Sequence, residues 1–181
     1  SIAFAARYPE RVEKLILASA VSEEWLDKNG QVYKTAKRLF HPNTAGMVWR
    51  LIRFFSGLFP QMTARNFYTQ FSKNKPHRLA REDINELLAA FKYYHSKSGF
   101  MCDIEHEIEP GVLAAIQCPT LIIHSKNDNS VPFEHAEYAK RMIKHSELLV
   151  LENEWGHLFW IGSDSIEPVR KTMEFIEHHR F

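Results

Sequence analysis

Short continuous runs of apolar residues occur near the start of the chain and again in its last third. The first extends from Val12 to Ala20, the second from Thr120 to His124, and the third from Leu148 to Leu151. Runs of this length and continuity are typical of strands that are buried on both faces of a parallel sheet. We therefore expect three parallel strands at these positions.

Helical periodicity lies between the last two runs and follows the third. Apolar residues recur at helical spacing from Phe133 to Ile143, so residues 119–151 predict a strand-helix-strand unit. A second helix is predicted over Ile166 to His178, with an apolar stripe formed by Ile166, Val169, Met173 and Ile176. Strands that alternate with helices in this way predict the α/β fold class, with parallel strands flanked by helices.

The stretch from residue 22 to residue 109 lacks this alternation, and its pattern is helical throughout. Its clearest helix is predicted over Arg81 to Lys97, with Gly99 as a signal for its end. The other predicted helices are Gln31 to Phe40, Met47 to Phe59 and Thr63 to Phe71, separated by proline-containing breaks. We expect a core domain made of residues 1–21 and 110–181, and an all-helical insertion, residues 22–109, that serves as its cap.

Composition and charge exclude several classes of protein. The 181 residues are 45% hydrophobic, and 23 Lys and Arg balance 22 Asp and Glu to a net charge of +1. This balance gives no electrostatic reason to expect nucleic acid as a partner. Cys102 and Cys118 form neither a metal-binding spacing nor a disulfide framework, which favours a reducing compartment, the cytoplasm. No apolar run approaches the roughly 18 residues of a membrane span.

Two residues with catalytic potential follow the second and third predicted strands. Asp128 lies in the loop after His124, and His157 lies in the loop after Leu151. Because the carboxyl ends of parallel strands meet at one edge of a sheet, we expect the two side chains to lie within hydrogen-bonding distance. A carboxylate beside an imidazole is the orienting half of a nucleophilic relay, in which the imidazole accepts a proton from a hydroxyl or thiol.

Plainer interpretations of these residues remain open. Asp128 lies among turn-forming residues and is also compatible with an ordinary turn, while His157 is also compatible with a solvated loop position. An acidic cluster, formed by Asp103, Glu105, Glu107 and Glu109, has no His or Cys at ligand spacing, so we expect a solvated face and no metal site. No pattern in the sequence indicates a cofactor.

Three stretches together resemble the α/β-hydrolase family. Residues 3–12, AFAARYPERV, followed by Leu15-Ile16-Leu17, are similar to the family's helix after the nucleophile elbow and its next strand. Residues 118–132, from CPTLIIH through Asp128 to Val131-Pro132, are similar to the acid loop, and Gly156-His157 is similar to the histidine loop. The resemblance implies a carboxyl-terminal part of this fold, with Asp128 and His157 as the acid and the base of a Ser-His-Asp mechanism.

The sequence departs from the family pattern at two places. His124-Ser125 stands where a His-Gly or Trp-Gly pair is usual, and the family's G-x-S-x-G elbow is absent. The elbow would lie roughly five to six residues before Ser1, so we expect a chain shortened at its amino end, with the nucleophile and the oxyanion hole outside it. Ser1 is then not the nucleophile; a simple helix-capping role for it is the alternative.

The predicted cap is rich in aromatic and basic residues. From Lys28 to Arg81 there are eleven Lys or Arg and no Asp or Glu. We expect the apolar side of the cap to line a substrate pocket and the basic side to face solvent; the candidate pocket residues are Trp49, Phe54, Phe55 and Phe67. The alternatives are an interfacial helix on a membrane surface, with Arg50 and Arg53 beside its apolar face, and attraction of anionic substrates.

The sequence as a whole predicts a hydrolase that acts on an ester, or on a related acyl or carbon-carbon bond, of a small apolar substrate. Because the nucleophile is expected outside these residues, we expect the chain as given to be inactive. A non-catalytic module of the same fold that binds a ligand, a partner or a membrane through its cap is the alternative. The sequence does not define an oligomeric state.

Overall fold

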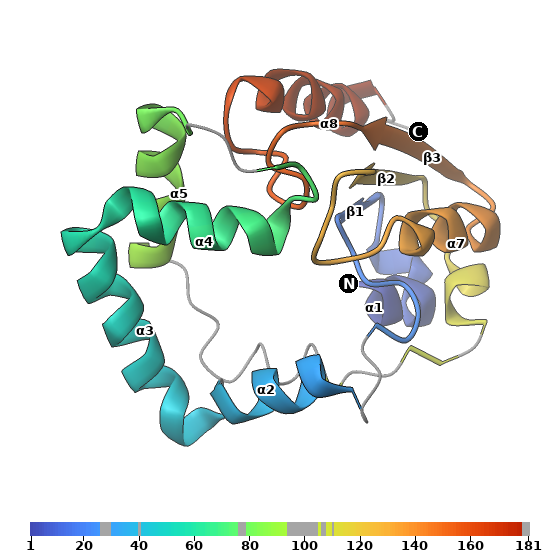
Figure 1. Cartoon of the computed structure of the whole chain (residues 1–181). Coiled ribbons are helices and arrows are strands. Elements are labelled where there is room, and N and C mark those ends of the chain that lie inside the picture. The colour runs from blue at the N-terminus through green and yellow to red at the C-terminus, as the bar shows by residue number, and fades with distance from the viewer. Residues whose placement is uncertain are drawn as a thin grey trace. The chain divides into compact units, whose positions relative to one another are not determined.

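A computed structural model describes residues 1–25, 30–39, 41–75, 79–93, 105, 108–109 and 111–178. The chain divides into two compact units, shown in Figure 1. The core unit consists of Ser1–Glu23, Thr69–Lys75 and Ile108–Phe181, and the helical unit consists of Glu24–Tyr68 and Pro76–Glu107.

The core unit contains a parallel sheet of three strands, in the order β1-β2-β3. The strands are β1 (Leu15–Ala18), β2 (Thr120–Ser125) and β3 (Ser146–Leu151). Thr120 of β2 is the register partner of Leu15 on one side and of Ser146 on the other. The three predicted strands are confirmed, although β1 is shorter than the apolar run that predicted it.

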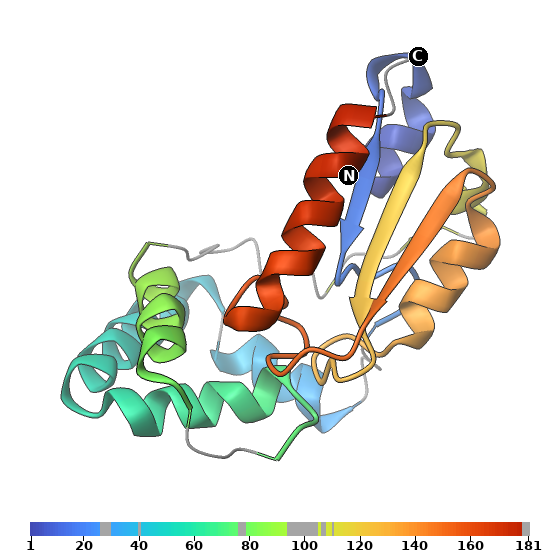
Figure 2. The same cartoon turned by 90° about the horizontal axis from the view of Figure 1, so that it is seen from above.

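Helices cover both faces of this sheet, as Figure 2 shows for α7 (Glu134–Met142) on one face and α8 (Ile166–His178) on the other. The face toward α7 also packs against α1 (Ile2–Arg7) and the short helix Val112–Ala115. Ile122 of β2 enters this cluster, whereas Leu121 and Ile123 enter the cluster toward α8. Because successive strand residues point to opposite faces, a central strand covered on both sides is apolar throughout.

The predicted apolar stripe of α8 is present, but it does not face the sheet. Its four members, Ile166, Val169, Met173 and Ile176, are all exposed. Pro168 and Phe175 on the opposite side of the helix are buried instead, and Phe175 packs against the sheet. The helix therefore has two apolar sides, and the described residues cover only one of them.

The helical unit contains α2 (Gln31–Leu39), α3 (Pro42–Leu58), most of α4 (Pro60–Phe71) and α5 (Arg81–Tyr93). Helices α3 and α4 both begin at a proline, several residues before their predicted starts. Proline fits the first position of a helix because that position needs no amide donor and the ring fixes a helical φ. Pro42 and Pro60, which were interpreted as breaks between helices, are the first residues of helices, while Pro76 lies outside the described residues. Phe40 and the predicted end of the last helix, including Gly99, lie outside the described residues.

Helix α3 presents different side chains on its two sides. On the inner side, Trp49 and Phe67 of α4 both contact Phe91 of α5, with ring centroids 6.1 Å and 4.3 Å from it. The outer side is an exposed apolar row, hereafter the outer stripe, formed by Met47, Leu51, Phe54, Phe55 and Leu58.

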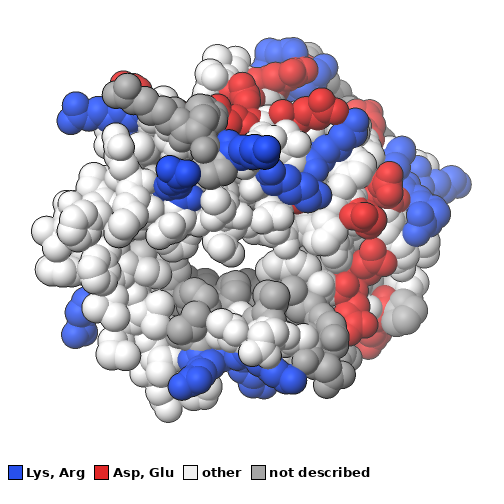
Figure 3. Space-filling view, in the orientation of Figure 1, with Lys and Arg blue, Asp and Glu red and all other residues white. Residues whose placement is uncertain are grey.

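In the view of Figure 3, charged side chains are sparse over α3 and α4, and acidic side chains gather over α7 and α8. No described helix is long and apolar enough to cross a membrane.

Candidate functional site

The acid loop begins where β2 ends at Ser125 and turns sharply around Asp128. The Asp128 side chain is fully buried, and its Oδ1 accepts hydrogen bonds from the backbone amides of Ser130 and Val131, both at 2.8 Å. A carboxylate that accepts local amide bonds in this way stabilises the turn. These two bonds leave Oδ2 directed at the histidine side chains described next.

The histidine loop follows β3 and requires glycine immediately before His157. Gly156 has a φ of +54°, and a Cβ at this position would lie 2.5 Å from the carbonyl oxygens of both Asn127 and Phe71. Only a residue without a side chain permits this left-handed backbone and this close approach. The glycine therefore brings the histidine loop into contact with the acid loop.

The predicted contact between Asp128 and His157 is present. His157 Nδ1 lies 2.9 Å from Asp128 Oδ2, and the His157 side chain is 21% exposed. Because the carboxylate only accepts hydrogen bonds, this contact places the proton on Nδ1 and leaves Nε2 as the basic nitrogen. Within the described part of the chain, no residue forms a hydrogen bond with Nε2.

A second imidazole, which the sequence analysis did not assign to the site, also faces this carboxylate. His124 is buried, and its Nε2 lies 3.3 Å from Asp128 Oδ2 and 3.0 Å from the carbonyl oxygen of Val131. Both neighbours are acceptors, so Nε2 of His124 carries a proton and donates. The available signal was its position four residues before Asp128 at the end of a buried strand.

The surroundings of Asp128 strongly favour its ionised form. Burial alone would raise the pKa of this carboxyl group, but the hydrogen bonds from His124 and His157, the charge of His157 and the Val131 amide together lower the pKa well below its usual range. A carboxylate that stays ionised orients a neighbouring imidazole and stabilises its protonated form.

The His157 backbone is also fixed by residues distant in sequence. Its amide donates to the carbonyl oxygen of Phe71 at 2.9 Å, and its carbonyl accepts from Ser19 Oγ at 3.1 Å. Ser19 follows β1 and has a φ of 45°, an uncommon conformation for a residue other than glycine. These long-range contacts have no signature in the sequence pattern, and the sequence analysis missed both residues.

The four predicted pocket aromatics do not form one group. Trp49 and Phe67 share the contact with Phe91 inside the helical unit, whereas Phe54 and Phe55 lie on the outer stripe and contact each other, with ring centroids 5.6 Å apart. Their proposed part in a substrate pocket remains a prediction. In the acidic cluster, Glu105 pairs with Lys37 at 2.8 Å, while Asp103 and Glu107 lie outside the described residues.

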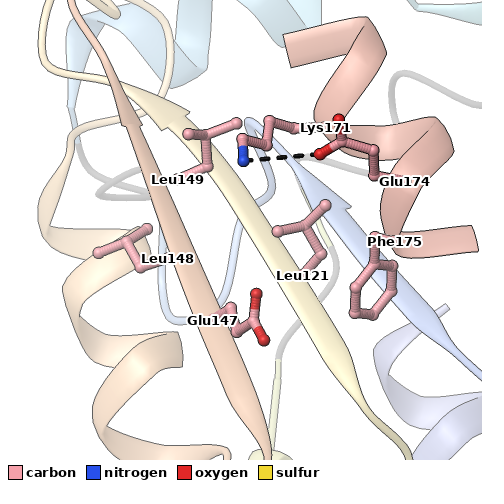
Figure 4. A pocket seen from close by; sticks show the side chains of 7 residues that line it. All are labelled: Leu121, Glu147, Leu148, Leu149, Lys171, Glu174 and Phe175. Atoms are coloured by element: carbon pink, nitrogen blue, oxygen red, sulfur yellow. Dashed lines mark ion pairs between the residues drawn. The ribbon is translucent and has the colours of Figure 1, made fainter. Parts of the chain in front are cut away.

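A separate hollow lies beside α8, away from Asp128 and His157. Figure 4 shows Leu149 and Glu147 of β3 on one side of it, and Lys171 and Glu174 of α8 on the other. Lys171 Nζ lies 3.5 Å from a Glu174 carboxylate oxygen, so the charges at this edge partly pair with each other. The hollow contains none of the predicted site residues.

Comparison with known proteins identifies the fold. A family model described as alpha/beta hydrolase fold matches residues 1–163. The uncharacterized hydrolase YcgS of Bacillus subtilis (strain 168) is 36% identical over 183 residues, which cover 97% of this chain and 64% of that protein. The chain therefore spans less than two thirds of the length of this curated relative.

Solved structures also resemble this chain along nearly its whole length. An alpha/beta hydrolase fold protein from Nakamurella multipartita superposes with a TM-score of 0.64 at 24% identity, covering 97% of this chain and 64% of that one. A thermophilic esterase from Thermogutta terrifontis gives 0.63 at 20% identity, covering 97% and 59%. At these identities the likeness concerns the fold. By its match to the family model over residues 1–163, the chain belongs to the α/β-hydrolase fold family.

Proposed function

We propose that this chain supplies the acid and the base of a hydrolase with a Ser-His-Asp mechanism. The observation that carries the proposal is the 2.9 Å contact between His157 Nδ1 and the buried Asp128 carboxylate. The substrate we propose is a small apolar molecule with an ester or a related acyl or carbon-carbon bond. The similar protein from Thermogutta terrifontis is an esterase, which supports an ester as one of these substrates.

In this mechanism His157 moves a proton and Asp128 does not. Nε2 of His157 accepts the proton of the attacking hydroxyl, and the Asp128 carboxylate stabilises the imidazolium that results. The same nitrogen then returns the proton to the leaving group. Nε2, which no described residue engages in a hydrogen bond, and the ionised carboxylate support these two roles.

We place the nucleophile and the oxyanion hole outside these 181 residues, because the chain has no G-x-S-x-G motif. We also propose that residues 22–109 form a cap that lines the substrate pocket with Trp49, Phe54, Phe55 and Phe67. The proposed compartment is the cytoplasm, which the buried free thiol of Cys118 supports.

The test compares this chain with a polypeptide that extends it upstream through an elbow. We expect no turnover of short acyl esters by the 181-residue chain, and turnover by the extended one that falls by about three powers of ten in His157→Ala. The matched control is His145→Ala, an exposed histidine of the same unit, which should retain activity. Unchanged turnover in the extended His157→Ala variant would overturn the mechanism.

A second candidate is a non-catalytic role in which the helical unit binds a ligand, a partner or a membrane surface. The outer stripe favours it, because five large apolar side chains are exposed beside Arg50 and Arg53. Vesicle binding that is lost on charge reversal at these two arginines would support the membrane version. A Gly or Ala at the elbow would support this candidate, a Ser or Cys the enzyme, and an Asp dehalogenation or epoxide opening.

A further inference from the structure

One segment of the helical insertion belongs to the core unit. Of the described residues between 24 and 107, those of Thr69–Lys75 cluster with the core and the others with the helical unit. The segment comprises the last turn of α4 and the residues after it, and Ser72 forms an isolated antiparallel bridge with Asp128. The segment thus reaches the acid loop directly.

The backbone of this segment joins the acid loop to the histidine loop. The carbonyl oxygen of Phe71 accepts from the amide of His157 at 2.9 Å and from the amide of Asn129 at 3.2 Å. Ser72 Oγ donates to the carbonyl oxygen of Glu154 at 2.6 Å. One carbonyl group therefore fixes both loops, and the distance between Asp128 and His157 depends on the position of residue 71.

The Phe71 side chain acts on the imidazole itself. Its ring is stacked on that of His157, with centroids 5.8 Å apart and planes inclined by 18°. Asp128 holds the imidazole at Nδ1, and a stacked ring restricts rotation out of that plane. Trp160 meets the same imidazole edge-on, with ring centroids 6.4 Å apart.

Stacking also matches the charge that His157 is proposed to acquire. The face of an aromatic ring carries partial negative charge, and a cation within about 6 Å of the ring centroid is attracted to it. The imidazolium formed when Nε2 accepts a proton is such a cation. An aliphatic side chain of similar size fills the same space without supplying this attraction.

We propose that Phe71 is a positioning residue for His157. Its carbonyl oxygen fixes the histidine loop, and its ring fixes the plane of the imidazole, so that Nε2 stays directed at the reacting hydroxyl. The inference rests on the proposed role of His157 as the base. It makes one segment of the insertion, Thr69–Lys75, a part of the relay.

The first test is a spectroscopic one on the 181-residue chain and needs no turnover. The Nδ1 proton of His157 is followed by NMR in a histidine-labelled sample, and its signal is assigned by its loss in His157→Gln. Phe71→Leu and Phe71→Met retain the backbone carbonyl and most of the volume but remove the ring, while Phe71→Tyr retains the ring. Phe175→Leu removes a ring elsewhere in the core unit and serves as the matched control.

We expect the Nδ1 proton to exchange with water at least several-fold faster in Phe71→Leu and Phe71→Met than in the wild type. Phe71→Tyr and Phe175→Leu should match the wild type. Thermal unfolding followed by circular dichroism identifies any variant that is not folded. Equal exchange rates in the wild type and in whichever ringless variant is folded would overturn the proposal, and so would loss of fold in both.

The second test uses the extended polypeptide. We expect kcat to fall by about 10-fold in Phe71→Leu with little change in KM, because misplacement of a catalytic group affects the chemical step, and to recover in Phe71→Tyr. An unchanged kcat would overturn the proposal.

Asp128→Asn distinguishes the two proposals. Loss of the protected proton in Asp128→Asn, together with no effect of Phe71→Leu, would refute the positioning role and leave the relay intact. A protected proton that survives Asp128→Asn would refute the relay itself.

Discussion

The loops of the core unit and the outer stripe of the helical unit differ in which kind of side chain is buried. The Asp128 carboxylate is fully buried, accepts hydrogen bonds from two backbone amides and faces two imidazoles. The five side chains of the outer stripe are apolar and between 45% and 60% exposed. Polar groups are buried in the loops of the core unit, and apolar side chains are exposed on the outer stripe.

The difference has consequences for stability and for function. Leaving a buried polar group without its partner costs about 1–3 kcal/mol, whereas surface substitutions usually change stability by less than about 0.5 kcal/mol. The loops of the core unit should therefore be sensitive to single substitutions that the outer stripe tolerates.

The largest effect on stability is expected for Asp128→Ala. The substitution leaves the part-buried imidazole of His157 and two backbone amides without their acceptor, and it removes one of the two acceptors of the buried His124. We expect the free energy of unfolding to fall by about 4 kcal/mol in denaturant titrations at neutral pH. Asp164→Ala is the matched control, because that carboxylate is exposed and accepts one amide bond, from Glu154. A similar loss of stability in both variants would show that burial of the carboxylate makes no difference to its contribution.

The same variant has a defined pH dependence. The pKa of Asp128 is lowered in the folded state, so its stabilisation is fully present above the ordinary value of 3.8 and is lost as the pH falls through the folded-state value. The difference in stability between the wild type and Asp128→Ala should therefore be constant near neutral pH and narrow below about pH 4. A difference that narrows already between pH 7 and pH 5 would contradict this assignment.

Replacing a phenylalanine by alanine should have different effects on stability on the two sides of α3. Phe91 is buried where Trp49 and Phe67 meet it, and Phe91→Ala should lower the free energy of unfolding by about 3 kcal/mol. Phe54→Ala removes an equal ring from the outer stripe and should change it by less than about 0.5 kcal/mol. A large loss in Phe54→Ala would mean that the outer stripe is covered in the folded protein.

Two glycines allow the effect of contact between the loops to be separated from that of backbone strain. Gly156 and Gly111 both have positive φ, but a Cβ would meet two carbonyl oxygens at 2.5 Å at Gly156 and nothing within 4 Å at Gly111. We expect Gly156→Ala to cost about 2 kcal/mol or more and Gly111→Ala about 1 kcal/mol, measured by thermal unfolding. Equal costs would show that backbone strain, and not contact between the loops, requires glycine.

Local pattern and short motifs predicted much of the core unit. The helix over Ile166–His178 has the predicted bounds, and the unit that begins after Cys118 has its two strands and its helix in the expected places. Asp128 and His157 meet as expected because each lies directly after a parallel strand, and adjacent parallel strands end at the same edge. In these places a few neighbouring residues determine the result.

Contacts between residues distant in sequence were not predicted. The sequence does not indicate that the carbonyl of Phe71 joins two loops, that Ser19 bonds to the backbone of His157, or that His124 shares the carboxylate of Asp128. The side of α8 that packs against the sheet was also not predictable, because both of its sides carry apolar residues. Periodicity identifies a helix but does not select between two apolar faces.

The smallest expected effect concerns His135, a buried histidine that has no part in the proposed relay. Burial is the main reason that the pKa of His135 is lowered, and its Nδ1 accepts hydrogen bonds from the amides of Ser22 and Glu23 at 3.2 Å and 3.4 Å. The unfolded chain binds a proton near the ordinary value of 6.5, while the folded protein resists it, so stability is lost as the pH falls below that value. His135→Asn keeps an acceptor near the position of Nδ1 but does not titrate, and it should remove a slope of at most about 1.4 kcal/mol per pH unit between pH 7 and pH 5. Denaturant titrations across this range measure the slope, and His145→Asn, at an exposed position, should leave it as in the wild type. A slope that is the same in the wild type and in His135→Asn would show that this buried histidine does not contribute to the pH dependence of stability.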